Sequence, residues 1–346
     1  MNANPKIYVA GHKGLVGSAI VRMLEGRGLT NIVTRSHKDL DLIDQGAVAD
    51  FFATEKPEYV FLAAAKVGGI MANVTYGAEF IYENLMIQTN TMHQSMLHDV
   101  KRLVFLGSSC IYPKMATQPI KEESLLTGPL EPTNSPYAVA KIAGIEMCWA
   151  YNAQYGTSFA PVMPTNLYGP RDNFDLQTSH VLPAMIRKFH LGKLAMAGDW
   201  DKIEADEERM GKIPNSIKDE IGYTKRDHSS CRVTLWGTGS PSREFLHVDD
   251  MARATGFVMF DTDTTELVNI GTGEEMTILD TATLIANIVG YSGDIIWDRD
   301  KPDGTARKVL DVRKINKMGW KHQIYLRQGL EKTYRSYLEA GRKEPL

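Results

Sequence analysis

The chain lacks several features that would place it in whole classes of protein. Its three cysteines, Cys110, Cys148 and Cys231, are too few and too scattered for a disulfide framework or a zinc site. No apolar run approaches the roughly 18 residues that a membrane-spanning helix needs, and residues 1–6 lack the basic and apolar blocks of a secretory signal. We therefore expect a cytoplasmic protein without a membrane anchor or a metal site.

An excess of charge of one sign is also missing. The 39 basic and 42 acidic residues are interspersed and leave a net charge of −3, so neither a nucleic acid nor an anionic membrane surface is expected as a partner. The length of 346 residues and the hydrophobic content of 43% are ordinary for an enzyme of about two domains.

Three glycines follow the first predicted strand at three-residue intervals. Residues 6–10 form a short apolar strand, Gly11, Gly14 and Gly17 come next, and residues 15–27 show the apolar spacing of a helix. Glycines permit a tight turn and a close approach of the backbone, and the helix N-terminus attracts a pyrophosphate. The pattern predicts a dinucleotide-binding turn.

The end of the second predicted strand, residues 32–34, indicates which dinucleotide binds. An NAD site usually has an acidic residue here for the ribose 2′-hydroxyl, whereas an NADP site needs positive charge for the 2′-phosphate. The strand end carries no carboxylate, and Lys13, Arg35, His37 and Lys38 together supply positive charge. We therefore expect NADPH, with residues 41–42 beside the adenine.

Alternating strands and helices predict the fold class. Buried strands are expected at residues 59–65, 103–106 and 160–163, with helices over 78–98 and 137–155. This alternation is typical of a Rossmann-type α/β fold, a doubly wound parallel sheet. We expect residues 1–170 to form the NADP-binding domain.

The rest of the chain is expected to form mainly a smaller α/β substrate lobe, residues 171–346, with segments around 236–270 returning to the first domain. A helix is predicted from residue 180 to about 190. Residues 193–232, which we name the charged insertion, are rich in charge and poor in apolar side chains, so we expect a surface insertion with marginal helices.

Two short stretches carry the chemistry. The strand over residues 103–106 leads to Ser108 at the sheet edge where ligands bind, and Tyr137 and Lys141, one helical turn apart, share a face. A Lys141 ammonium group and an oxidised nicotinamide would lower the pKa of a tyrosine from its usual value near 10. The pattern predicts hydride transfer to a carbonyl that Ser108 orients and Tyr137 protonates, with Lys141 also binding the nicotinamide ribose.

Longer motifs resemble those of a known family. They lie at residues 10–14 (AGHKG), 63–70 (AAAKVGGI), 107–114 (GSSCIYPK), 163–170 (MPTNLYGP) and 301–305 (KPDGT), together with an NxGTG element at Asn269. Outside the charged insertion, nearly the whole chain resembles the GDP-L-fucose synthases of the extended short-chain dehydrogenase/reductase superfamily. That family converts GDP-4-keto-6-deoxy-D-mannose to GDP-L-fucose by epimerisation at C3 and C5 and then reduction of the C4 ketone with NADPH.

The resemblance implies two further catalytic residues, Cys110 as the base and His180 as the acid of the epimerisation. Taken alone, Cys110 would be interpreted as a packing residue and His180 as a capping or core residue. An ordinary thiol, with a pKa near 8.5, needs activation to act as a base at neutral pH, and we expect Lys141 and the charged cofactor to supply it.

The resemblance also implies binding residues and a homodimer, which the family forms through the helices over 78–98 and 137–155. This chain has lysine at two positions, 13 and 188, that often carry arginine in the family. The positive charge is retained there, but the bidentate hydrogen bonding of an arginine guanidinium is lost. The expected GDP-sugar contacts are Lys188, Trp236, Arg243 and Lys301, with a contribution from Glu275. The expected cofactor contacts are Gly11, His12, Lys13, Gly14, Leu15, Val16, Gly17, Arg35, His37, Asp41, Leu42, Ala64, Leu106, Gly107, Ser108, Lys141, Pro164, Thr165, Asn166, Leu167 and His180.

Three alternatives remain open at this point. A GDP-L-colitose synthase, which epimerises only C5 of a 3-deoxy sugar, would use Cys110, His180 and Tyr137 equally well. A 4,6-dehydratase is disfavoured because Ser109 and Cys110 stand where those enzymes have threonine and glutamate, and a non-catalytic NADP-binding scaffold is disfavoured by the retained reductase residues. The charged insertion could cover the GDP site, add to an interface or extend into solvent.

Overall fold

The computed structural model describes residues 4–301 and 303–340, and the chain divides into two compact units. Residues 1–3, at which no secretory signal was expected, and Pro302 of the KPDGT motif lie outside the described residues. Unit 1 consists of Met1–Leu167, Glu244–Gly273 and Val309–Ile324, and unit 2 of Tyr168–Arg243, Glu274–Lys308 and Tyr325–Leu346. The last segment of unit 1 was not anticipated from the sequence, and the roles expected for the two units stay predictions.

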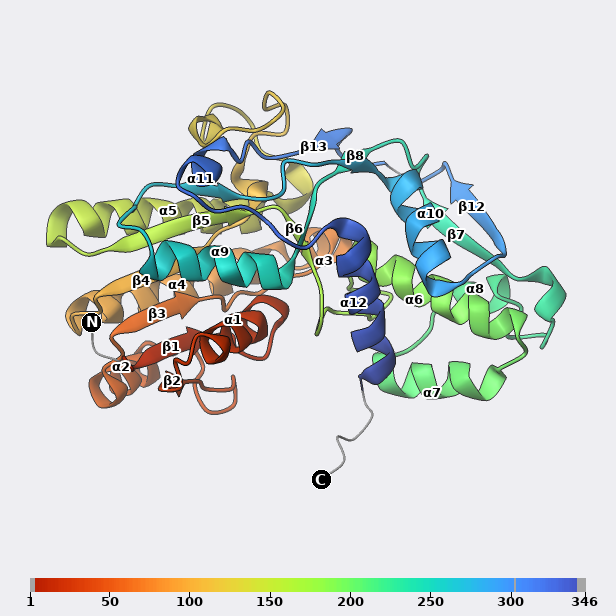
Figure 1. The fold of residues 1–346 in the computed structure, drawn as a ribbon, viewed down its shortest axis with the longest axis horizontal. Helices are drawn as coiled ribbons and strands as arrows, with labels where there is room; N and C mark the ends of the chain where they lie inside the picture. The colour runs from red at the N-terminus through yellow and green to blue at the C-terminus, as the bar shows by residue number, and fades with distance from the viewer. Residues whose placement is uncertain (1–3, 302, 341–346) are drawn as a thin grey trace. The chain divides into compact units, whose positions relative to one another are not determined.

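Unit 1 contains a six-stranded parallel sheet with the strand order β10-β5-β4-β3-β1-β2 (Figure 1). Its strands are β1 (Ile7–Ala10), β2 (Ile32–Val33), β3 (Tyr59–Leu62), β4 (Arg102–Leu106), β5 (Phe159–Pro164) and β10 (Val268–Ile270). Its helices are α1 (Leu15–Gly26), α2 (Gln45–Glu55), α3 (Ile70–Thr75), α4 (Gly77–Leu97), α5 (Ser135–Tyr155), α9 (Val248–Phe260) and α11 (Arg313–Lys317). The predicted Rossmann-type doubly wound sheet is confirmed.

Helices cover both faces of this sheet. α1 packs beside α9, and α4 packs beside both α2 and α5. Apart from Arg102 at the start of β4, the side chains of β3, β4 and β5 are consequently apolar or aromatic, and Phe61, Phe105 and Phe159 are fully buried. The strand order changes direction between β1 and β3, and ligands of such sheets bind at the carboxyl ends of the strands near this point.

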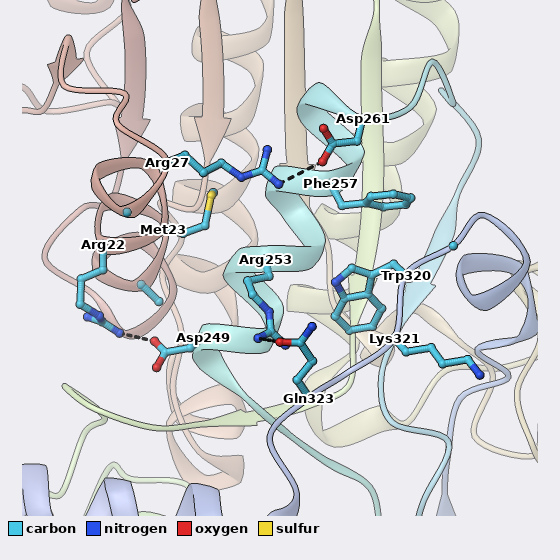
Figure 2. Close-up of a pocket in the computed structure, with 13 residues that line it drawn as sticks. Arg22, Met23, Arg27, Asp249, Arg253, Phe257, Asp261, Trp320, Lys321 and Gln323 are labelled. Atoms are coloured by element: carbon cyan, nitrogen blue, oxygen red, sulfur yellow. Dashed lines mark hydrogen bonds and ion pairs between the residues drawn. The ribbon is translucent and has the colours of Figure 1, made fainter.

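A pocket of about 510 Å³ lies along α1 and α9 and is not at that edge (Figure 2). It follows α1 from Ala19 to Arg27, whereas the glycine turn precedes the other end of that helix. Its arginines are already engaged, since Arg22 pairs with Asp249 at 2.7 Å and Arg27 with Asp261 at 3.0 Å. The candidate chemistry therefore lies elsewhere.

Unit 2 is built from small sheets and helices. The strands β7 (Arg232–Trp236) and β12 (Asp294–Asp298) pair in parallel, and β11 (Met276–Thr277), β8 (Ser242–Arg243) and β13 (Arg307–Lys308) form a three-stranded sheet. The helices are α6 (Val181–Met196), α7 (Trp200–Met210), α8 (Asn215–Glu220), α10 (Ile278–Val289) and α12 (Leu326–Glu339). One further pair of short strands, β6 (Asn166–Tyr168) with β9 (Phe245–His247), lies next to the points where the chain leaves and re-enters unit 1.

The charged insertion is better ordered than its composition suggests, and of the three alternatives left open for it, extension into solvent is wrong. Ile203, Ile213 and Ile221 are fully buried and pack against apolar side chains of α6. A buried ion pair of 2.8 Å joins Arg187 of α6 to Asp206 of α7, with side chains 0% and 2% exposed. The few apolar residues are spaced to meet one surface, and α6 continues past the predicted end near residue 190 to supply that surface.

Among the helices described, none is both long enough and apolar enough to cross a bilayer.

Candidate active site

The glycine turn has the geometry of a dinucleotide cradle. Gly11 has a φ of +83°, and a Cβ there would lie 2.8 Å from the backbone nitrogen of Ala64 at the end of β3. A Cβ at Gly17 would lie 2.1 Å from the carbonyl oxygen of Gly11, and the Gly14 amide donates to that same oxygen at 3.0 Å. Side chains are thus excluded where β1, β3 and the first turn of α1 meet, which leaves the helix N-terminus open to an anionic group.

A carboxylate that the sequence analysis did not consider, that of Asp39, follows β2 after six residues. Ser36 donates to this carboxylate from both the hydroxyl and the amide, at 2.5 and 3.2 Å. These bonds, together with the charges of Lys13 and Arg35, lower the pKa of Asp39. The strand end itself, residues 32–38, carries no carboxylate, and the charges of Lys13 and Arg35 lie near it.

Arg35 also has a structural partner. Its guanidinium forms an ion pair with Glu55 of α2 and donates to the carbonyl oxygen of Thr34 at 2.8 Å. His37 is exposed and lies 3.8 Å from Asp41, while Leu42 is buried and its carbonyl oxygen accepts a bond from Asn90. The side chains of Lys13 and His37 are thus better available to a 2′-phosphate than Arg35 is.

The carboxyl ends of β5 and β10 are tied together by Glu244, a residue that sequence reasoning missed. Its buried carboxylate accepts the amides of Thr272, Gly273 and Leu310 at 2.6 to 2.8 Å, and its carbonyl oxygen accepts from Thr165 and Asn166. The predicted cofactor residues from 164 to 167 therefore form a rigid edge. The sequence run REFLHVDD, residues 243–250, which contains Glu244, was the available signal for this role.

The structure brings Ser108, Cys110 and Tyr137 together in unit 1. Ser108 follows β4, its hydroxyl accepts the Cys110 amide at 3.3 Å, and Cys110 lies in the short 3₁₀ turn over Ser109–Ile111. Tyr137 is in the first turn of α5, and burial raises its pKa, as does the charge of Cys110, whereas a hydrogen bond with Ser108 lowers it. Asn134, just before α5, donates from Nδ2 to the Cys110 sulfur at 3.3 Å.

Lys141 lies near Tyr137, one turn further along α5. Its Nζ lies 5.8 Å from the centre of the Tyr137 ring and donates to the carbonyl oxygen of Leu106 at 2.9 Å. Burial lowers the pKa of Lys141 to about 7. Burial also raises the pKa of Tyr137, and the lowering expected from Lys141 together with an oxidised nicotinamide stays a prediction.

His180 lies in unit 2, at the residue immediately before α6. The loop that delivers it is organised by Asp175, whose carboxylate accepts the amides of Gln177 and Thr178 at 3.0 Å each. Desolvation lowers the pKa of His180. Its predicted role as an acid stays a prediction.

Three of the residues expected at the GDP-sugar lie near one another in unit 2. Lys301 Nζ is 5.7 Å from the ring centre of Trp236, which is 57% exposed. Arg243 lies close to Gly304, and the charge of Asp303 opposes the lowering of its pKa by desolvation. Asp303, a residue of the KPDGT motif that was not singled out, accepts the amide and hydroxyl of Thr238 at 2.6 and 2.8 Å.

Lys188 and Glu275 are directed at protein groups. Lys188 Nζ donates to the carbonyl oxygen of Thr234 in β7 at 2.9 Å, and desolvation lowers its pKa. The Glu275 carboxylate accepts the Nε–H of Arg307 at 2.8 and 2.9 Å. Lys188 thus supports the strand that ends at Trp236, while a ligand contact by Glu275 would compete with its ion pair.

Comparisons with known proteins agree with this organisation. Residues 7–271 match the model of the NAD dependent epimerase/dehydratase family. GDP-L-fucose synthase 1 of Arabidopsis thaliana is 52% identical over 334 residues, which cover 96% of this chain and 93% of that protein. GDP-L-fucose synthase of Escherichia coli is 48% identical, with 96% and 97% covered, and GDP-L-colitose synthase of Yersinia pseudotuberculosis is 30% identical, with 96% and 98% covered.

Solved structures are similar over almost the whole chain. A GDP-6-OMe-4-keto-L-xylo-heptose reductase from C. jejuni superposes with a TM-score of 0.89 at 43% identity, and covers 98% of this chain and 99% of its own. A GDP-D-glycero-L-gluco-heptose synthase from Campylobacter jejuni, solved in the presence of NADPH, gives 0.88 at 42% identity with the same coverage. With the glycine cradle and the serine–tyrosine pair in place, these matches show that the chain belongs to the NAD dependent epimerase/dehydratase family.

Proposed function

We propose that the chain is a GDP-L-fucose synthase, which converts GDP-4-keto-6-deoxy-D-mannose to GDP-L-fucose with NADPH. The observation that carries the proposal is the contact group of Ser108, Cys110 and Tyr137, in which a thiol stands beside the two groups of a ketone reductase. The identities of about 50% to GDP-L-fucose synthases support the same substrate.

The cofactor residues fit NADPH. The cradle at Gly11 and Gly17 has no room for side chains, and near the end of β2, where a 2′-phosphate would bind, the side chains of Lys13 and His37 are better available than Arg35, which pairs with Glu55. NADPH, when bound, supplies the hydride for the C4 carbon. A similar structure solved in the presence of NADPH supports this choice.

The protein's groups then divide the proton transfers. The C4 ketone acidifies the hydrogens on C3 and C5, so a Cys110 thiolate can accept each proton while the electron pair of the C–H bond moves into an enolate. His180 returns a proton to the opposite face of the carbon. In the reduction, Ser108 holds the ketone oxygen and Tyr137, which its raised pKa keeps protonated, gives the proton to the developing alkoxide.

Product analysis tests the proposal. Incubation with GDP-4-keto-6-deoxy-D-mannose and NADPH should yield GDP-L-fucose, identified by NMR, with one NADPH oxidised per product. A Cys110→Ser variant should lose solvent deuterium incorporation at C3 and C5. NADPH binding without ketone-dependent oxidation would instead support the scaffold, and turnover of only the 3-deoxy keto sugar would support the colitose synthase, to which the identity is only 30%.

A second candidate function is the reduction of a GDP-4-keto-heptose. It is favoured by the similarity to two GDP-heptose enzymes at TM-scores of 0.88 and 0.89, with sequence identities of 42% and 43%. A 4-keto heptose differs from the 6-deoxy hexose at C6 and beyond, so the same reductase groups would serve it. Parallel assays with both ketones decide, and a higher kcat/KM for the heptose would overturn the fucose assignment.

We also propose a homodimer formed through α4 and α5. These helices pack on each other within unit 1, and their outer sides carry exposed apolar residues, among them Tyr82 at 57% and Val139 at 42%. A monomer would leave this surface in water. Light scattering should give twice the mass of one chain, and a Tyr82→Glu variant should give the mass of a single chain.

The cytoplasmic location stays a prediction. All three cysteines lie among the described residues and none forms a disulfide, which supports this prediction.

A further inference from the structure

Asn134 contacts the Cys110 thiol and has no role in the scheme above. Its Nδ2 lies 3.3 Å from the Cys110 sulfur, although 24 residues separate the two in the chain. Cys110 is in the 3₁₀ turn after β4, and Asn134 ends a second 3₁₀ turn, Pro132–Asn134, directly before α5. The contact therefore joins the two stretches that carry the reductase groups.

The position of Asn134 makes this contact unusual. Asparagine is among the best N-cap residues because its side-chain oxygen accepts an amide of the first helical turn, a bond worth about 1 kcal/mol. Asn134 is the N-cap of α5, yet its side chain makes no capping bond. Pro136, the second residue of the helix, has no N–H to offer, so the structural value of such a cap is reduced.

The rest of the side chain is equally uncommitted. Its Oδ1 is enclosed and has no hydrogen-bond partner within the described part of the chain, so the sulfur contact is the one side-chain hydrogen bond that the structure shows for Asn134. A residue that breaks a local rule without a structural gain often belongs to a functional site.

The chemistry of a thiol base explains what this contact does. Only the thiolate can accept a proton from carbon, and an N–H that donates to a negatively charged sulfur is bound about twice as strongly as one that donates to a neutral acceptor. Lys141, one of the two activators expected from the sequence, donates to the Leu106 carbonyl oxygen. The amide of Asn134 is a donor that the protein itself holds at the sulfur.

We propose that Asn134 is a positioning residue for Cys110, whose Nδ2–H group holds the sulfur in place and stabilises the thiolate over the thiol. The part that concerns C3 and C5 rests on the proposed function: the thiolate takes a proton from carbon, the electron pair of the C–H bond enters the enolate, and the neutral thiol remains. The stabilisation of the thiolate is independent of any substrate.

The first experiment measures the thiolate without a sugar. Full-length protein is alkylated with iodoacetamide between pH 6 and pH 10, and the peptides are quantified by mass spectrometry. Asn134→Asp replaces the donor with a carboxylate of the same shape, and Asn134→Ala removes it. We expect the midpoint of Cys110 alkylation to rise by about one pH unit in the aspartate variant, and by less in the alanine variant, as the loss of a charge-assisted bond implies.

Matched controls separate this effect from general loosening. Ser135→Ala alters the next residue of the helix start and should leave the Cys110 profile unchanged. Cys148, which is fully buried, and Cys231 report on the rest of the fold in the same digest. An unchanged Cys110 midpoint in both Asn134 variants, or a parallel rise in reactivity at Cys148, would overturn the proposal.

The second experiment uses the keto sugar and NADPH. Asn134→Ala should reduce the kcat of deuterium incorporation at C3 and C5 by about tenfold or more at pH 7 and move its pH profile upward, with the Kd for NADPH unchanged. If the wild-type protein does not process this sugar, the proposed function fails, while the alkylation profile still decides the role of Asn134. A drop in exchange that is equal at all pH values would refute stabilisation of the thiolate.

Discussion

Replacing Arg187 with methionine should destabilise unit 2 far more than a surface substitution in the same region. The guanidinium is fully buried and donates from Nε to Asp206 at 2.8 Å. Its terminal nitrogens donate to the carbonyl oxygens of Phe174, Met210 and Gly211. Methionine would fill part of the space but leave these acceptors buried without their donor. Removal of one partner of a buried ion pair costs about 3–5 kcal/mol, a large share of the 5–15 kcal/mol that stabilises a typical domain.

Urea unfolding combined with hydrogen exchange across α7 measures this loss. Lys202→Met is the matched control, because Lys202 pairs with Asp199 at 2.7 Å on the surface, with side chains 68% and 38% exposed. Such a pair contributes at most about 1 kcal/mol. We expect a loss of about 3–5 kcal/mol and faster exchange in α7 for Arg187→Met alone. Losses below about 1 kcal/mol in both variants would refute the reasoning that the buried pair anchors the charged insertion.

Three further predictions concern the site and the loop before α6. Tyr137→Phe should slow C4 reduction about a hundredfold or more, as loss of a general acid does, while NMR still detects deuterium exchange at C3 and C5. Loss of both reduction and exchange would contradict the assignment of the two steps to separate proton-transfer groups. In a fluorescence titration, Gly17→Ala should weaken NADPH binding at least about tenfold, a change of 1.4 kcal/mol, because the added Cβ would lie 2.1 Å from the Gly11 carbonyl oxygen. Gly26→Ala is the control: its Cβ would have no neighbour within 4 Å, so NADPH binding should be normal. Burial raises the pKa of Asp172 to about 7. The protonated carboxyl therefore stabilises the fold below its ordinary pKa near 4, and this stability is lost as the pH rises to 7. In urea unfolding, the free energy of unfolding of Asp172→Asn should rise relative to that of the wild type by up to about 4 kcal/mol between pH 4 and pH 8, and parallel pH curves for the two proteins would contradict this.

The parts of the molecule that follow local rules were predictable from the sequence. The strand, the three glycines and the helix after them depend on backbone conformation and steric room, and Gly11 and Gly17 occupy the positions where a Cβ has no space. Tyr137 and Lys141 share a helix face because helical geometry requires it. The alternation of buried strands with helices likewise specified the parallel sheet.

Contacts between distant segments were not predictable in the same way. The charged insertion was misjudged because its average composition hides a buried pair between Arg187 and Asp206. Asn134 lies in a Pro-rich stretch whose conformation no periodicity describes, so its approach to Cys110 is visible only in three dimensions.

The coupling between the Cys110 thiol and the Tyr137 phenol connects the two halves of the proposed reaction. A negative charge on Cys110 raises the pKa of Tyr137, since two neighbouring groups that are partly or fully buried do not both ionise readily. The thiolate that epimerisation needs therefore keeps the tyrosine protonated, and a protonated tyrosine is the form that the later reduction consumes. Asn134 contributes to the same balance, because a donor at the sulfur stabilises the charge on the base without placing a positive charge beside the phenol. A lysine at that position would favour both ionised forms and leave the reduction without its acid, so a neutral amide suits a site that must epimerise before it reduces.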